Sequence, residues 1–236
     1  MLVKTKGSAI VGIDAVTITI EVNVSMGQGY CIVGLPDNAV KESLDRTESA
    51  IKSNGFHMPR TKLVINLSPA DLKKSGAAFD LPIAIGILAA SEQITQPSLI
   101  EKYLIMGELG LDGSLYPIKG ILAMAMQAKE EGFAAMIIPT QNAAEALMVE
   151  GIPVFAFSSL NEVVYFLNNP CYEKEYSQQD ASGSWSYRTA INYVWSTRGL
   201  AMQGYSLSCE CYSVSPASRQ PMFCLGQGHP RCGGLF

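Results

Sequence analysis

The sequence predicts an α/β fold built on a mixed sheet. Between residues 16 and 24, apolar and polar side chains alternate strictly, which is the pattern of a half-buried strand. After about residue 118, strand-like and helix-like patterns alternate, which favours parallel strands joined by helical crossovers. Hydrophobic residues make up 48% of the 236 residues and charged residues 16%, so the chain has enough apolar side chains for a substantial core.

The first predicted unit is strand, strand, helix. The strand over residues 16–24 is followed by the turn "SMGQG", and "YCIVGL" is predicted to be its partner strand. A helix then begins at Pro36-Asp37, with Asp37 as the N-cap, and Asn54-Gly55 ends it.

The second unit contains a buried helix and a hairpin. "KLVINL", residues 62–67, is an apolar run of strand length. Asp80 is predicted to cap a helix that tolerates Pro82 in its first turn, and this helix is apolar on all sides and therefore buried. "YLIMGELGLDGSLYPI" is predicted to be a hairpin that turns at Asp112-Gly113.

The third unit alternates helices and strands. A helix over about residues 119–131 is predicted to end at Gly132. It is followed by the strand "AAMIIP", the helix "NAAEALMVEG", the strand "VFAF" and the helix "SLNEVVYFL".

The chain changes character after Pro170. The remainder is rich in serine, glycine and cysteine, lacks lysine after Lys174, and shows no sustained period of either kind. We therefore predict a domain over residues 1–170 and an irregular, disordered segment over residues 171–236, with limited proteolysis ending the stable core between about residues 165 and 180. Zinc is an alternative for the cysteine-rich segment, but the spacing of the candidate ligands is irregular, so no metal is predicted for Cys209, Cys211, Cys224, His229 and Cys232.

Charge and hydropathy limit the classes of molecule that the chain is expected to bind. A net charge of −4 and a pI near 5.3 give no overall attraction to phosphate backbones. Contact with DNA would need a local patch, and the candidates are Arg60, Lys62, Lys73 and Lys74, for which ordinary solvated charge is the default interpretation. The longest uncharged apolar stretch, residues 81–90, is half of the ~20 residues that span a bilayer, and the N-terminus has no signal-peptide pattern. A cytoplasmic protein without membrane contact is expected.

Two long segments carry a family resemblance. They are "IVGLPDNAVKESLDRTESAIKSNGFHMPRTKLVINLSPADLKKSGAAFDLPIAIGILAAS" and "GELGLDGSLYPIKGILAMAMQAKEEGFAAMIIP". Over about residues 3–170 the chain resembles the N-terminal domain of the magnesium-chelatase-like AAA+ ATPases of the ComM/YifB type. The resemblance implies the ribosomal-protein-S5-domain-2-like fold, which is also the fold of the Lon protease catalytic domain and of the C-terminal domain of the RadA recombination protein.

The resemblance also locates an empty catalytic site. Lon-type proteases use a serine activated by a lysine, and the resemblance places the serine position at Ala78 and the lysine position at Leu122. Neither side chain can act as a nucleophile, acid or base, so a non-catalytic domain is predicted. The alternative is a peptidase with a displaced dyad, formed by one of two nearby serines and one of three lysines: Ser68, Ser75, Lys73, Lys74 and Lys119.

A loop within the first of these two segments is also a candidate interaction loop. Its members are Asp71, Lys73, Lys74 and Asp80. For Asp80 and Glu108 we expect buried polar bonds that hold loops in place.

The full-length relatives carry an ATPase motor. The resemblance implies ATP and magnesium in those proteins, hexamers formed through the ATPase domain, and a role in DNA branch migration and natural transformation. This chain has no G-x-x-x-x-G-K-[ST] phosphate loop, so no cofactor is predicted for it. The partners that the resemblance suggests are other copies of the chain and DNA, the latter through a full-length assembly. A stand-alone DNA- or protein-binding module is a further alternative. We also hypothesise that residues after about Asp180 come from a shifted reading frame that truncated the protein, which sequencing of the gene would test.

Overall fold

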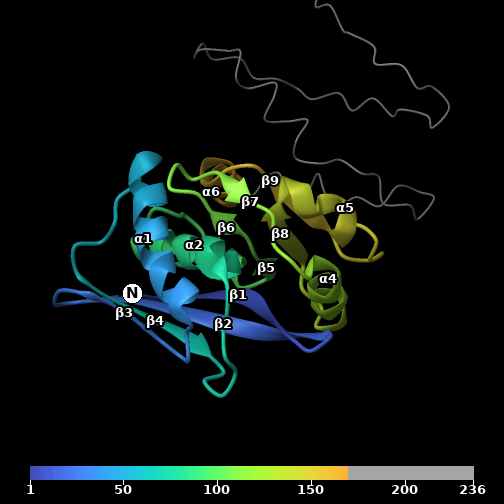
Figure 1. Ribbon diagram of the computed structural model, residues 1–236. Coiled ribbons are helices and arrows are strands. Elements are labelled where there is room, and N and C mark those ends of the chain that lie inside the picture. Colours follow the sequence, from blue (N-terminus) through green and yellow to red (C-terminus); the bar gives the residue numbers. More distant parts are fainter. Residues whose placement is uncertain (170–236) are drawn as a thin grey trace, which may run out of the picture. The chain divides into compact units, whose positions relative to one another are not determined.

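The computed structural model describes residues 1–169, and a seven-stranded mixed sheet forms its centre (Figure 1). The strand order is β3-β4-β2-β1-β5-β8-β9. The predicted α/β class with a mixed sheet is confirmed, since both parallel and antiparallel neighbours occur in this one sheet.

The first half of the sheet is built on a long antiparallel hairpin. β1 (Leu2–Val11) pairs with β2 (Asp14–Ser25) from Leu2 opposite Asn23 to Val11 opposite Asp14. β2 covers the strand predicted over residues 16–24, and its Ile18, Ile20 and Val22 are fully buried, as the alternation requires.

The predicted partner of β2 is wrong. β3 (Tyr30–Val33) does not lie beside β2, because β4 (Lys62–Ser68) is inserted between them, antiparallel to β2 and parallel to β3. β4 is the longer strand and buries alternate side chains completely at Leu63, Ile65 and Leu67, so it gains more from a central position than the four-residue β3 does.

The second half of the sheet is parallel, as predicted. β5 (Tyr103–Ile105) pairs with β1 through Lys6 and Leu104, and β8 (Ala135–Pro139) and β9 (Val154–Phe157) follow in order. The crossovers contain α4 (Ile121–Glu130) and, after the 3₁₀ turn Thr140–Asn142, α5 (Ala143–Ala146). α5 is much shorter than the helix predicted over "NAAEALMVEG", whereas α6 (Leu160–Asn168) forms as predicted, with Ser159 as its N-cap.

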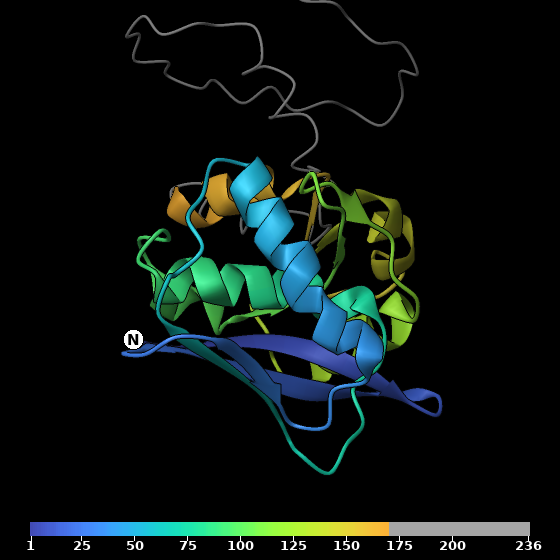
Figure 2. The same ribbon diagram turned by 60° about the vertical axis from the view of Figure 1, so that its left-hand side comes forward.

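Helices cover both faces of the sheet. α1 (Asn38–Ser53) and α2 (Asp80–Ala90) lie on one face, where α1 crosses over α2 (Figure 2). Gln127 of α4 binds Ser8 and Thr17, whose side chains point to the face opposite the buried Ile18 and Ile20. α4 therefore covers the other face. A short helix, α3 (Pro97–Ile100), contacts β1.

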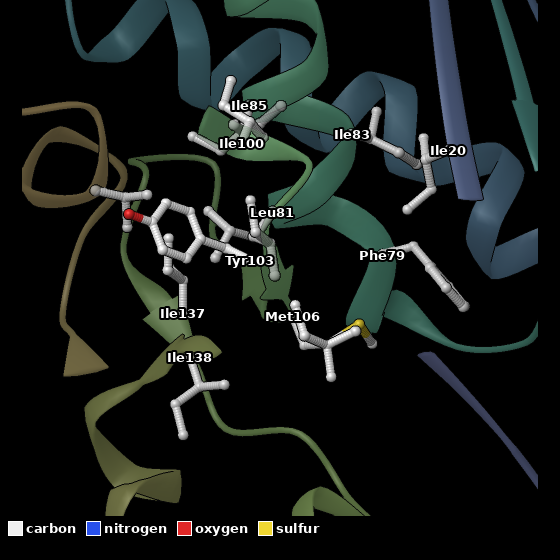
Figure 3. Packing of buried hydrophobic residues seen from close by; sticks show 14 of the residues in the cluster. Ile20, Phe79, Leu81, Ile83, Ile85, Ile100, Tyr103, Met106, Ile137 and Ile138 are labelled. Atoms are coloured by element: carbon white, nitrogen blue, oxygen red, sulfur yellow. The ribbon is translucent and has the colours of Figure 1, made fainter. Parts of the chain in front are cut away.

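α2 is the centre of the core. Every residue of α2 is buried, which confirms the prediction from its uniformly apolar sequence. Figure 3 shows its Leu81, Ile83 and Ile85 packed with side chains from the sheet and from neighbouring loops. A Cβ placed on Gly86 would lie 2.6 Å from a methyl carbon of Val22, so glycine at this position allows the helix to approach β2 closely.

The predicted hairpin over residues 103–118 forms only at its tip. β6 (Glu108–Leu109) and β7 (Leu115–Tyr116) pair around the turn, where Gly113 has φ 84°. The residues of β5 leave the hairpin and join the central sheet, because a position between β1 and β8 buries all three of their side chains.

Candidate functional site

The segment between β4 and α2, residues 69–79, carries most of the predicted site residues. Ala78 lies in a 3₁₀ turn (Ala77–Phe79) directly before α2, and its carbonyl accepts a hydrogen bond of 3.0 Å from the Gly107 N–H. Its side chain is partly buried against the core. A methyl group therefore occupies the turn where the resemblance places a nucleophile.

Leu122, at the predicted lysine position, is the second residue of α4. Its side chain is 39% exposed, and its N–H donates to a Glu145 carboxylate oxygen at 3.1 Å. Neither Ala78 nor Leu122 offers a proton donor or acceptor on its side chain.

Asp80 has a different role from the predicted N-cap. Phe79 occupies the N-cap position of α2, and the fully buried Asp80 carboxylate instead accepts two hydrogen bonds from Arg46 of α1, from Nε at 2.7 Å and from Nη2 at 3.0 Å. It accepts a third, at 3.3 Å, from the N–H of Leu109 in β6. The expected buried polar bonds are therefore present at Asp80, and they join α1, α2 and β6.

The Arg46 guanidinium is held as firmly as the carboxylate. Its Nη2 also donates to the Ala39 carbonyl at 2.9 Å. The hydrogen bond to Asp80 raises the pKa of Arg46, against the opposing effect of burial, and the nearby charge of the half-buried Glu108 adds to the rise. Sequence reasoning missed Arg46, because nothing in the pattern of α1 indicates that one of its charged residues faces a buried carboxylate.

Lys74 is buried, which corrects its interpretation as solvated charge. Its side chain is fully enclosed, and the ammonium donates to the Pro69 carbonyl within the same loop. Burial lowers the pKa of Lys74, although the charge of Asp71 opposes this effect. The predicted basic patch is therefore reduced to Arg60, Lys62 and Lys73, which are exposed.

The backbone of Lys74 fastens the loop to the start of α1. Its N–H donates to the Leu35 carbonyl at 3.3 Å, and its carbonyl accepts from the Asp37 N–H at 3.0 Å. Asp37 is the N-cap of α1, as predicted, and uses one carboxylate oxygen for the Val40 N–H and the other for the Gly76 N–H. This second bond was not predictable, because it depends on how the two loops meet.

The structure does not assemble the residues of a displaced dyad around one hydroxyl. Ser75, Lys73 and Lys119 are exposed, and Ser68 is half-buried at the end of β4. The one buried amine, that of Lys74, binds a carbonyl oxygen. Of the predicted interaction loop, Asp71 and Lys73 face solvent, whereas Lys74 and Asp80 do not.

Residues 1–169 contain no helix that is long and apolar enough to cross a membrane. Within the same range, no group of three or more His, Cys, Asp or Glu side chains could hold a metal ion. The cysteines and the histidine weighed as zinc ligands, and the predicted segment 171–236, lie outside the described residues.

Fold and loop together define an α/β domain of the ChlI and Lon-like type. The family described as subunit ChlI of Mg-chelatase matches residues 20–142, which is just over half of the chain, and the chain belongs to this family.

The chain is also similar to individual proteins of the ComM and YifB type. The chain is 41% identical over 196 residues to the YifB protein of Salmonella typhimurium, covering 81% of this chain and 38% of that protein. It is 42% identical over 161 residues to the competence protein ComM of Haemophilus influenzae, covering 68% of this chain and 31% of that protein. A Lon protease of Lachnoclostridium phytofermentans is 26% identical over 171 residues, covering 67% of this chain and 21% of the protease.

The matches cover only part of each relative, and one of them extends beyond the described residues of this chain. The chain spans about a third of the length of the ComM and YifB relatives. The match to the Salmonella protein, at 81% of the chain, is longer than residues 1–169, so the similarity continues into the sequence that follows them.

Proposed function

We propose that residues 1–169 act as a non-catalytic, Lon-like domain of a ComM/YifB-type protein, in which it works beside an AAA+ ATPase motor in DNA branch migration during natural transformation. The observation that carries this proposal is the Ala78 turn. The Gly107 N–H donates a hydrogen bond to the backbone of this turn, yet the side chains of Ala78 and Leu122 provide no nucleophile and no base.

The polar groups around the turn support a structural role. Asp80 and Arg46 satisfy one another, and Lys74 binds a backbone carbonyl, so these buried charges are used to hold the loop against α1 and β6. Buried polar networks of this kind define one arrangement of loops. We propose that the domain contributes a rigid shape to the full-length assembly, while ATP, magnesium, self-association and contact with DNA belong to that assembly.

A domain exchange tests this function. Residues 1–169 replace the matching segment of the Haemophilus influenzae ComM protein, and natural transformation is measured in cells that carry the chimera. Transformation near the level of unmodified ComM is expected. A chimera that is stably produced but leaves transformation at the level of a deletion strain would contradict the proposal.

One observation favours the alternative of a displaced peptidase dyad. A buried lysine with a lowered pKa is the kind of group that can accept a proton from serine, and Lys74 meets that condition. The test is labelling with a fluorophosphonate probe together with casein hydrolysis. We expect neither. Labelling at Ser68 or Ser75 that disappears in Lys74→Met, while the variant keeps its folded circular dichroism spectrum, would establish the peptidase instead.

A further inference from the structure

The two edges of the sheet are protected to very different degrees. β9 forms one edge, and three of its four residues are buried. β3 forms the other edge (Figure 1). Its Tyr30, Cys31 and Val33 are exposed, and its Ile32 is half-buried. Natural sheets protect such edges with lysine, proline or a bulge, because an open apolar edge pairs with other chains. β3, with the sequence YCIV, contains no charged residue and no proline.

The backbone of β3 offers two residues for pairing on its open side. The Gly29 carbonyl accepts a hydrogen bond from the Leu63 N–H of β4, so Gly29 points toward β4. Successive residues of a strand direct their N–H and C=O groups alternately to its two sides. Cys31 and Val33 therefore also point toward β4, whereas Tyr30 and Ile32 direct two N–H donors and two carbonyl acceptors away from the sheet.

The apolar edge continues beyond the strand at both ends. Met26, in the loop before β3, is 96% exposed. Leu35, two residues after the strand, is 56% exposed and has φ 55°, in the left-handed region that disfavours residues other than glycine. The hydrogen bond from the Lys74 N–H to the Leu35 carbonyl helps to hold this conformation. A strained backbone that presents a leucine to solvent is typical of a binding surface rather than of a loop that only connects.

Positive charge lies at the start of the edge. Lys62 is opposite Ser25 in the pairing of β4 with β2, and its side chain lies against Gly27. Arg60 follows Pro59, whose carbonyl accepts a hydrogen bond of 3.0 Å from the Tyr30 hydroxyl. Both cations are exposed, and within residues 1–169 neither forms an ion pair.

We infer that β3 is a docking edge for an extended peptide strand that has alternating β-branched residues and an acidic end. The peptide adds an eighth strand to the sheet through Tyr30 and Ile32, its apolar side chains contact Val33 and Leu35, and its acidic end lies beside Arg60 and Lys62. A second copy of the chain is the less suitable occupant, because a four-residue edge supplies far less than the roughly 1,200 Å² that stable protein interfaces bury. The inference does not depend on whether the domain is catalytic.

Fluorescence anisotropy with the full chain tests the docking edge. The probes are labelled peptides of sequence EEVTVTVT and TVTVTVEE, capped at both ends, so that the acidic end meets Arg60 and Lys62 in a parallel or an antiparallel arrangement, respectively. One of the two is expected to bind with a Kd below about 1 mM. Its counterpart with lysine in place of glutamate is expected to bind at least about fivefold more weakly.

Two edge variants and one matched control locate the site. Ile32→Pro removes an N–H on the open side and leaves the β4 pairing intact, and Val33→Lys places a charge on the edge; each is expected to weaken binding at least about tenfold. Met126→Lys makes the same chemical change at an exposed apolar position on α4, and binding should be unchanged. Circular dichroism shows whether each variant is folded, and Val33→Lys serves if Ile32→Pro is not.

A peptide modification distinguishes strand addition from adhesion to an apolar surface. N-methylation of the valines and N-methylation of the threonines are compared, and strand pairing requires that one pattern abolishes binding while the other does not. Equal effects of the two patterns would overturn the inference. The inference would also be overturned if neither acidic peptide binds. It would be overturned as well if a single-stranded oligonucleotide binds in their place through Arg60 and Lys62, or if sedimentation analysis shows a dimer that Val33→Lys dissociates.

Discussion

The buried pair of Arg46 and Asp80 provides the sharpest test of how the loop before α2 is held. In Arg46→Met the methionine fills much of the same volume, but the Asp80 carboxylate keeps only the Leu109 N–H at 3.3 Å. Asp80 is fully buried and the Arg46 side chain is 22% exposed, so the carboxylate is left without a compensating charge. We expect a loss of about 3–5 kcal/mol in the free energy of unfolding, measured by urea denaturation at about pH 7.

The loss should depend on the second partner. The double variant Arg46→Met, Asp80→Leu removes both charges and should be more stable than Arg46→Met alone. A loss below about 1 kcal/mol, or a double variant less stable than the single one, would refute the assignment of Arg46 as the partner that makes the buried Asp80 tolerable.

Three further predictions follow from single positions. Burial lowers the pKa of Lys74, so the native state binds fewer protons at this residue than the unfolded chain does. The free energy of unfolding should therefore rise as the pH approaches the unfolded pKa of about 10.4. Lys74→Met should remove that rise in urea denaturation between about pH 8 and 10. A Cβ at Gly34, which has φ 100°, would lie 2.1 Å from the Leu67 carbonyl oxygen, so Gly34→Ala should lower the free energy of unfolding by more than about 3 kcal/mol. Gly12 has φ 68° and no atom within 4 Å of such a Cβ, so Gly12→Ala should lower it by about 1–2 kcal/mol. Similar losses for the two variants in the same denaturation experiment would contradict the reasoning. The hydrogen bond from Asn66, more than the charge of Lys4, lowers the pKa of Glu21. The contribution of this hydrogen bond to stability is therefore present above the unfolded pKa of Glu21 and is lost as the pH falls through its folded pKa. In Asn66→Leu, the midpoint of thermal unfolding should depend less on pH in the acidic range than in the unmodified protein.

The local elements were predictable where one residue type determines the structure. Asp37 caps α1 as expected, because a carboxylate before a helix satisfies its first N–H groups. The uniformly apolar sequence from Leu81 to Ala90 could only be a buried helix, and the turn at Gly113 needs positive φ. In each case the signal lies within a few residues of the element itself.

The arrangement of those elements was less predictable. The placement of β4 between β2 and β3 depends on which strand buries more apolar surface in a central position. The order of the strands in the sequence suggested β3, wrongly, as the neighbour of β2. Lys74 was expected in water, because its neighbours in the chain are polar. Its burial depends on the path of the loop around Pro69 and on contacts with Leu35 and Asp37, which lie more than thirty residues away. Asp80 likewise found a partner in Arg46 that no spacing rule connects to it.

The junction between β1 and β5 has a consequence for the order in which the chain can fold. The half of the sheet formed by β1 to β4 is complete once the first 68 residues exist, and its strands pair over shorter sequence distances than β1 and β5 do. The parallel half can be attached only after β5 has been synthesised, because β1 joins it through the pairing of Lys6 with Leu104. Contacts so distant in sequence slow folding, since a long loop must close before they form. On the ribosome, β1 should therefore spend the interval with one side unpaired, and α2, which is synthesised in between and is entirely apolar, is the element whose early docking on β1 and β2 would protect the nascent chain from aggregation.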